Sequence, residues 1–217
     1  MNLRLSWPRF VIAAVLLGIQ APSAPAQTGA RARPANLHEA TYRGGLVTPP
    51  LPKPRFTLTD TSGASFDFWE KTQGYVTLLF FGYARCPDQC PLHMANIAMA
   101  LKKMPTSLRD HVKLVFVTTD PTRDAPKVLR SWLNGFDARF IGLTGSEAAI
   151  EAAQRATGVP PASKTALASG DYGVAHANFV LVYTKDNLAH LIYPGGITEQ
   201  DWAHDLPQLL KEASWNR

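Results

Sequence analysis

The chain has 217 residues and a formal net charge of +5, and two of its residues are cysteines. The lysines and arginines are scattered rather than clustered, which argues against a nucleic-acid-binding surface. Two cysteines are too few for a disulfide-dense scaffold, and a chain of this length can bury a core without disulfides. A purely structural need for the two thiols is therefore weak.

Residues 1–26 have the layout of a secretory signal. Two arginines, Arg4 and Arg9, precede an apolar stretch, Phe10–Ile19, and small residues follow it at Ala24–Ala26. We expect cleavage near Ala26 and an exported, periplasmic protein. The alternative is an uncleaved anchor in the inner membrane, although the stretch is short of the roughly 20 residues that a span requires. Cleavage lowers the net charge to +3, because the segment holds two arginines and no acidic residue.

Residues 27–53 are rich in Ala, Pro, Gly and Arg and show no periodicity, so we interpret them as a flexible linker. One folded domain is expected over residues 54–217. The elements predicted at its start are a strand pair, a short helical turn and a buried strand of β-forming residues. In chain order these are Phe56–Thr59, Ser65–Phe68, Trp69–Gln73 and Val76–Phe81.

After this strand, helices and strands alternate. Apolar residues at spacings of three and four predict helices, and short β-branched runs predict strands. The alternation favours an α/β fold, with a mostly parallel central sheet, helices on both faces and a C-terminal β-hairpin. The predicted elements are a helix over Pro91–Met104, a strand over Val112–Thr118, a helix over Pro126–Leu133, a strand over Arg139–Leu143, a helix over Ser146–Ala156, a long polar loop over Val159–Gly173, hairpin strands over His176–Thr184 and Leu188–Tyr193, and a last helix capped by Thr198.

Cys86 and Cys90 lie where the buried strand gives way to a helix. Unpaired N–H groups at a helix N-terminus favour the thiolate, the form that attacks disulfides and binds soft metals. Redox motifs of the CxxC kind have two residues between the cysteines, whereas this pair has three. The wider spacing still permits a disulfide, but it also suits one soft ion such as Cu(I) or Zn(II). Two sulfurs do not complete a metal site, so a third ligand is expected.

His176 is the candidate for the third ligand. It follows the long loop, and in parallel-sheet folds sites collect around the carboxyl ends of strands. From its position alone, a histidine satisfied by a backbone carbonyl stays an equal alternative. His93 is the competing candidate, although we interpret it as a solvent-facing helix residue. Asp120 and Asp124 follow another buried strand. Asp124 is expected to cap the next helix, with support of the site as the alternative.

Three segments, Phe80–Pro91, Val117–Pro126 and Tyr172–His176, resemble the SCO/SenC family of copper chaperones for cytochrome c oxidase assembly. The resemblance spans about residues 56–210. It implies a thioredoxin-like fold and an exported, often membrane-tethered domain. The implied recipient of copper is the dinuclear copper centre of an oxidase subunit.

The resemblance also implies the ligands. The family binds Cu(I), and in some members Cu(II), through both cysteines and one distant histidine, which correspond to Cys86, Cys90 and His176. Ala175 stands where the family usually has an aspartate before that histidine.

These observations support a copper-delivery protein that binds and transfers its metal without turning over a substrate. Its partners would be the copper-accepting subunit of a cytochrome c oxidase, and another copper chaperone or a thiol reductant. The main alternative is a thiol–disulfide oxidoreductase, in which Cys86 attacks and Cys90 resolves. A peroxide-reducing thiol enzyme and an exported domain with one structural disulfide are the remaining alternatives.

Overall fold

The computed structural model describes residues 42–168 and 170–211, which all belong to one compact unit, Ala35–Arg217. The predicted signal, residues 1–26, and the first part of the predicted linker lie outside the described residues. Within the described ranges, no helix combines the length and the apolar character needed to cross a membrane.

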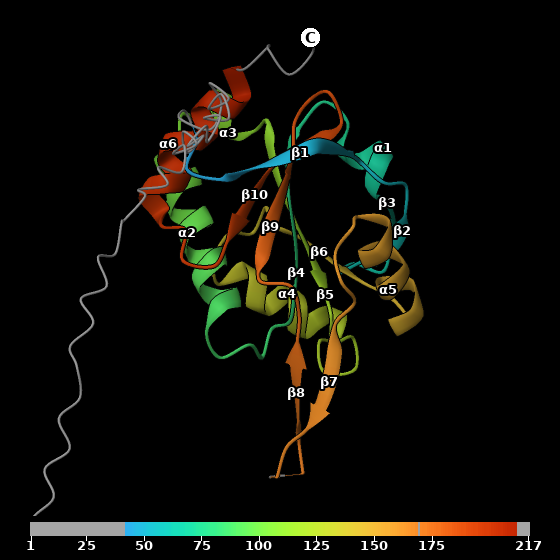
Figure 1. Ribbon diagram of the computed structural model, residues 1–217. Helices are drawn as coiled ribbons and strands as arrows, with labels where there is room; N and C mark the ends of the chain where they lie inside the picture. The colour runs from blue at the N-terminus through green and yellow to red at the C-terminus, as the bar shows by residue number, and fades with distance from the viewer. Residues whose placement is uncertain (1–41, 169, 212–217) are drawn as a thin grey trace, which may run out of the picture. The chain divides into compact units, whose positions relative to one another are not determined.

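The order of the elements follows the predicted alternation, with three additions: a strand before residue 54, a short helix before the strand at Val112, and a strand pair in the region of the predicted polar loop (Figure 1). The elements are β1 (Gly45–Pro52), β2 (Thr57–Asp60), β3 (Ser65–Asp67), α1 (Phe68–Thr72), β4 (Val76–Gly82), α2 (Gln89–Lys103), α3 (Thr106–Arg109), β5 (Val112–Thr118), α4 (Pro126–Asn134), β6 (Ile141–Thr144), α5 (Glu147–Ala156), β7 (Ser163–Ala166), β8 (Tyr172–Ala175), β9 (Phe179–Tyr183), β10 (Leu188–Pro194) and α6 (Glu199–Lys211).

Eight of these strands form one sheet in the order β1-β10-β9-β4-β5-β6-β2-β3. The parallel pairing expected from the alternation is found at the centre of the sheet, where β4 pairs with β5 and β5 with β6. The flanking pairs are antiparallel, including the predicted hairpin of β9 and β10. The sheet is thus mixed, with its parallel strands in the middle.

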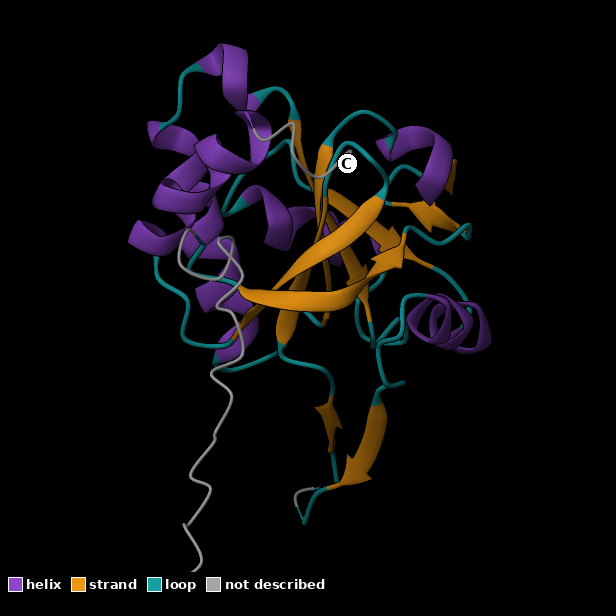
Figure 2. Ribbon diagram, turned by 45° about the horizontal axis from the view of Figure 1, so that its top comes forward, coloured by secondary structure: helices purple, strands orange, loops and turns teal. Residues whose placement is uncertain are grey.

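The central strand β4 contributes to a core on each face of the sheet because its side chains alternate. Leu78 and Phe80 pack with buried residues of α2, α4 and α6, whereas Leu79 and Phe81 pack with buried residues of α1 and α5. All seven residues of β4 are buried. Helices therefore cover both faces, as expected (Figure 2).

The folded unit begins earlier than residue 54, because β1 occupies the end of the predicted linker. This strand pairs antiparallel with β10, with Leu46 opposite Leu191 and Leu51 opposite Ala189. β1 is an edge strand, and edge strands tolerate the prolines that suggested a linker. The buried carboxylate of Asp205 also accepts a 2.8 Å hydrogen bond from the backbone N–H of Arg43.

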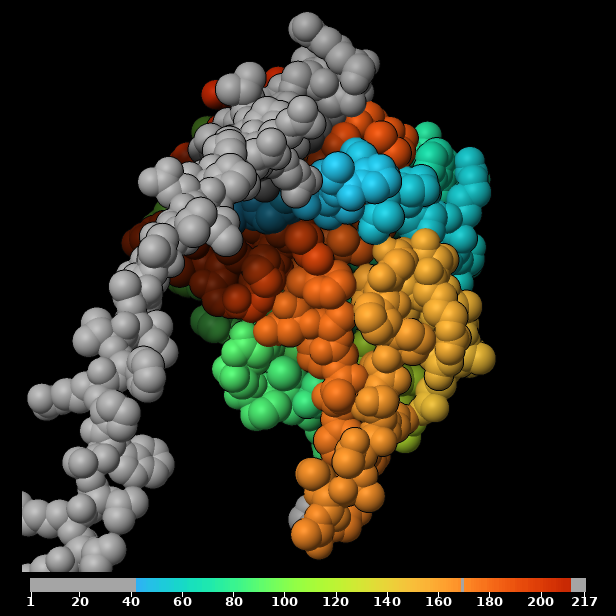
Figure 3. Space-filling view, in the orientation of Figure 1, coloured from blue at the N-terminus to red at the C-terminus, as the bar shows by residue number. Residues whose placement is uncertain are grey.

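The predicted loop over Val159–Gly173 contains a second hairpin, which corrects the sequence interpretation. β7 and β8 pair antiparallel as a separate two-stranded sheet and project from the body of the unit (Figure 3). All four residues of β7 are exposed, so the sequence lacks the apolar alternation that would predict a strand here. His176 consequently follows β8 and lies before β9, instead of beginning the β9 strand as predicted.

Candidate metal centre

The two cysteines lie at the junction of β4 and α2, as predicted. Cys90 is in the first turn of α2 and is fully buried, whereas Cys86 precedes the helix and is partly exposed. The backbone N–H of Cys90 lies 3.5 Å from the sulfur of Cys86. Both thiols are free. The helix N-terminus therefore directs an N–H group at the more accessible sulfur.

The pKa values of the two thiols are shifted in opposite directions. The hydrogen bond from the Cys90 side chain, supported by backbone N–H groups, lowers the pKa of Cys86 to about 4. The neighbouring Cys86 thiolate and burial raise the pKa of Cys90. Near neutral pH and without metal, the pair is therefore one thiolate and one thiol, and Cys90 must lose its proton when it binds a metal ion.

His176 lies with the two sulfurs, and its tautomer presents a free nitrogen to them. Nδ1 is 3.0 Å from the carbonyl oxygen of Ala177. Because a carbonyl only accepts, Nδ1 carries the proton and Nε2 keeps its lone pair in the neutral ring. Nε2 is 3.4 Å from the sulfur of Cys90, and the ligand atoms of Cys86, Cys90 and His176 all lie within 4.8 Å of one another.

These three donors fit a small, soft ion. Two thiolates and one imidazole suit Cu(I) or Zn(II) better than a hard cation such as Mg²⁺. Aromatic rings enclose the imidazole, with the ring centroids of Phe80 and Tyr83 at 5.9 Å and 5.6 Å from that of His176. The structure thus brings the three predicted residues together, and their role as ligands stays a prediction.

A buried polar cluster connects the loop after β5 with the turn end of the β7–β8 hairpin. Asp120 is fully buried and accepts a 2.8 Å hydrogen bond from the hydroxyl of Tyr172 and another from Nε of Arg123. The Arg123 guanidinium lies 3.8 Å above the ring of Tyr172, a cation–π arrangement. Sequence reasoning placed Asp120 near the site but did not find these partners.

Asp124 supports the cysteine loop, so the prediction that it caps α4 is wrong. The N-cap of α4 is Ala125, without a side-chain hydrogen bond. The buried Oδ2 of Asp124 accepts hydrogen bonds from the backbone N–H of Ala84 at 2.8 Å and from the hydroxyl of Thr118 at 2.7 Å. Burial raises the pKa of Asp124. This side chain joins the loop before Cys86 to the end of β5.

His93 is buried, contrary to its interpretation as a solvent-facing residue. It is 2% exposed and is not among the three residues whose ligand atoms converge. The signal that could have placed it was its spacing from Cys90 and Ile97, because residues three and four apart share one helix face.

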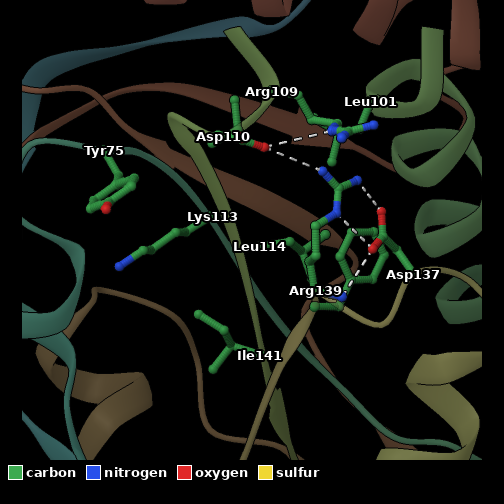
Figure 4. A pocket seen from close by; sticks show the side chains of 11 residues that line it. Tyr75, Leu101, Arg109, Asp110, Lys113, Leu114, Asp137, Arg139 and Ile141 are labelled. Carbon is green, nitrogen blue, oxygen red and sulfur yellow. Dashed lines mark hydrogen bonds and ion pairs between the residues drawn. The ribbon is translucent and has the colours of Figure 1, made fainter. Parts of the chain in front are cut away.

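A separate pocket of about 270 Å³ lies at the opposite end of the parallel strands, near the first residues of β4, β5 and β6 (Figure 4). Its rim carries charges that face one another. Nε of Arg139 donates to Asp137 at 2.9 Å, and Asp110 lies 3.8 Å from Nε of Arg109 and 3.9 Å from the Arg139 guanidinium. The cysteines, at the carboxyl end of β4, are therefore not part of this pocket.

The fold and the Cys-Cys-His group define a thioredoxin-like protein with a candidate soft-metal centre. The SCO1/SenC family model matches residues 48–211. The chain belongs to this family.

Solved structures agree with this assignment. The chain is 30% identical to Bradyrhizobium japonicum ScoI with copper bound, with a TM-score of 0.65 over 73% of this chain and 99% of that one. It is 32% identical to apo Sco1 from Thermus thermophilus, with a TM-score of 0.69 over 78% of this chain and 97% of that one.

Among curated proteins, a putative copper-binding protein from Stutzerimonas stutzeri is 36% identical over 132 residues, which are 59% of this chain. The match covers 63% of that protein, and the match to the SCO2-like protein RP587 of Rickettsia prowazekii covers 46% of the relative. The chain thus spans less than two thirds of the length of these relatives.

Proposed function

We propose that this protein binds copper through Cys86, Cys90 and His176 and delivers it to the dinuclear copper centre of cytochrome c oxidase during assembly. The observation that carries the proposal is the convergence of two sulfurs and one imidazole nitrogen within 4.8 Å. A related protein, B. japonicum ScoI, has been solved with copper bound. The Sco family is a family of cytochrome c oxidase assembly proteins. The signal-like segment at residues 1–26 supports delivery in the periplasm.

The arrangement suits transfer as well as binding. A three-ligand site leaves an approach open to a fourth ligand, so a thiolate of the recipient can bind the ion before the first ligands leave. Cys86 is the more exposed of the two sulfurs, which makes it the side of the site that the recipient reaches. Cu(I) is the form that two thiolates favour.

The test is an anaerobic Cu(I) titration of the reduced protein against a chromophoric competitor. We expect one copper ion per chain, near-complete loss of binding in Cys86→Ser and Cys90→Ser, and at least tenfold weaker binding in His176→Ala. His111→Ala is the matched control, because His111 is exposed at the opposite end of the sheet, just before β5. Equal affinity of the parent and His176→Ala would refute the three-ligand site.

The acidity difference between the thiols favours a second function, thiol–disulfide exchange. The Cys86 thiolate would attack a disulfide of the recipient and form a mixed disulfide with it, releasing one recipient thiol. Cys90 would then attack the Cys86 sulfur and release the second thiol, so that the protein gains a disulfide and the recipient gains two thiols. This activity would prepare the recipient's cysteines for copper. Measuring the reduction potential and the rate with an oxidised recipient peptide tests it, and a protein that reduces no disulfide would exclude it.

A further inference from the structure

His93 makes a hydrogen bond that joins the helix of Cys90 to the segment of His176. Nε2 of His93 lies 3.1 Å from Oδ1 of Asn178, and an amide oxygen only accepts, so Nε2 carries the proton. The two residues are separated by 85 positions in the chain. His93 is three residues after Cys90, and Asn178 is two residues after His176. One side-chain contact thus bridges the elements that carry two of the three ligands.

Asn178 is held from two further directions. Its side-chain amide donates a 3.2 Å hydrogen bond to Gln89, at the start of α2. Its backbone carbonyl accepts a 3.0 Å hydrogen bond from the backbone N–H of Gly195. A Cβ at Gly195 would lie 2.2 Å from the Asn178 amide nitrogen, so this close approach requires glycine. The position of Asn178 is therefore defined before any metal binds.

The ring of Phe80 lies against both His93 and His176. The ring centroid of Phe80 is 5.0 Å from that of His93 and 5.9 Å from that of His176. Phe80 is a fully buried residue of β4. Burial lowers the pKa of His93, which agrees with a neutral ring that donates from Nε2. One buried ring of β4 thus packs against both imidazoles.

We propose that His93 is a positioning residue that, through Asn178, holds the segment 176–178 against α2 so that Nε2 of His176 faces the two sulfurs. This inference rests on the proposed copper binding. His93 touches no metal in this arrangement. It aligns the third ligand in advance, which reduces the ordering that binding would otherwise require.

The test is a double-mutant cycle on Cu(I) affinity with His93→Phe and His176→Ala. Phenylalanine keeps a buried ring beside Phe80 but cannot donate to Asn178. We expect His93→Phe to weaken binding about tenfold and to have no further effect when His176 is already alanine. X-ray absorption of copper-loaded His93→Phe should show both sulfurs with a reduced nitrogen contribution.

Asn96→Ala is the control on the same helix. Asn96 donates a 2.9 Å hydrogen bond from α2 to the carbonyl of Ile197, so its loss removes a helix contact that does not involve the His176 segment. Copper affinity should be unchanged in this variant. An equal loss of affinity from His93→Phe in both backgrounds, or no loss in the parent, would overturn the positioning role.

A measurement without metal separates this proposal from the proposed function. In ¹⁵N spectra of the reduced apoprotein, we expect one fixed His176 tautomer with the proton on Nδ1, and tautomer averaging in His93→Phe. The same fixed tautomer in both proteins would refute the positioning role. If the tautomer is fixed in the parent and averaged in His93→Phe, yet the parent binds no copper, the proposed function alone is overturned.

Discussion

The hydroxyl of Tyr172 donates a 2.8 Å hydrogen bond to the buried carboxylate of Asp120. Tyr172 is the first residue of β8, the strand that leads directly to His176. Asp120 follows β5, whose parallel neighbour β4 leads to the cysteines. The contact therefore ties the turn end of the hairpin, where Tyr172 pairs with Ala166, to the carboxyl end of the parallel strands, where the cysteines lie.

Replacing Asp120 should destabilise the protein strongly. Asp120→Asn removes the buried partner of Arg123 and weakens the acceptor of the Tyr172 hydroxyl. Loss of one member of a buried ion pair costs about 3–5 kcal/mol, which urea unfolding followed by circular dichroism would measure. The control is Glu151→Gln, which breaks the exposed pair of Glu151 and Arg155 and should change stability by less than about 1 kcal/mol. Similar unfolding midpoints for the two variants would contradict the role of Asp120.

The acidity of Cys86 predicts an unusual pH dependence of alkylation. Because its pKa is lowered to about 4, the thiolate is present at pH values above this and is lost only as the pH falls through it. The rate with iodoacetamide, which follows the thiolate fraction, should be nearly constant from about pH 6 to pH 8. Removing the Cys90 thiol, the main cause of the shift, should raise the pKa of Cys86 and restore a rate that rises with pH. A parent rate that climbs about tenfold per pH unit through this range would rule out the thiolate.

The parts of the structure that have a local signal were predicted from the sequence. The apolar run of β4 and the helical spacing of α2 identified the junction that holds both cysteines. The order of strands and helices indicated the α/β class. The position of His176 after the long loop made it the candidate third ligand, with a histidine satisfied by a backbone carbonyl as an equal alternative, and the family resemblance then favoured the ligand.

The parts that were missed depend on contacts between distant segments. Strand β7 has no buried residue, and the β7–β8 hairpin is held by Tyr172 and Arg123, whose partners are far away in the chain. Asp124 stands just before a helix, where aspartate is a common cap. Its actual partner, the N–H of Ala84, is 40 residues away in the chain, and no sequence pattern indicates that contact. β1 has the composition of a linker, and its place in the fold depends on pairing with β10, a strand more than 130 residues later in the chain.

A methyl group at Gly82 should lower both the stability of the protein and its affinity for copper. Gly82 is the last residue of β4, and a Cβ there would lie 2.8 Å from the Cys90 sulfur and 3.1 Å from the Phe116 ring. β4 pairs with strands on both sides, so its backbone cannot move away easily, and overpacking of this kind costs about 1–3 kcal/mol. Gly82→Ala should therefore lower the free energy of unfolding by this amount and weaken Cu(I) binding by displacing Cys90.

Gly45→Ala provides the comparison for Gly82→Ala. Gly45 is also in a strand, but a Cβ there would be 3.5 Å from its nearest neighbour, an ordinary contact. Alanine also restricts the unfolded chain, so this variant should be as stable as the parent or slightly more stable, with unchanged copper affinity. If Gly82→Ala matches Gly45→Ala in both unfolding and copper titration, the close approach of Gly82 to Cys90 does not constrain the site.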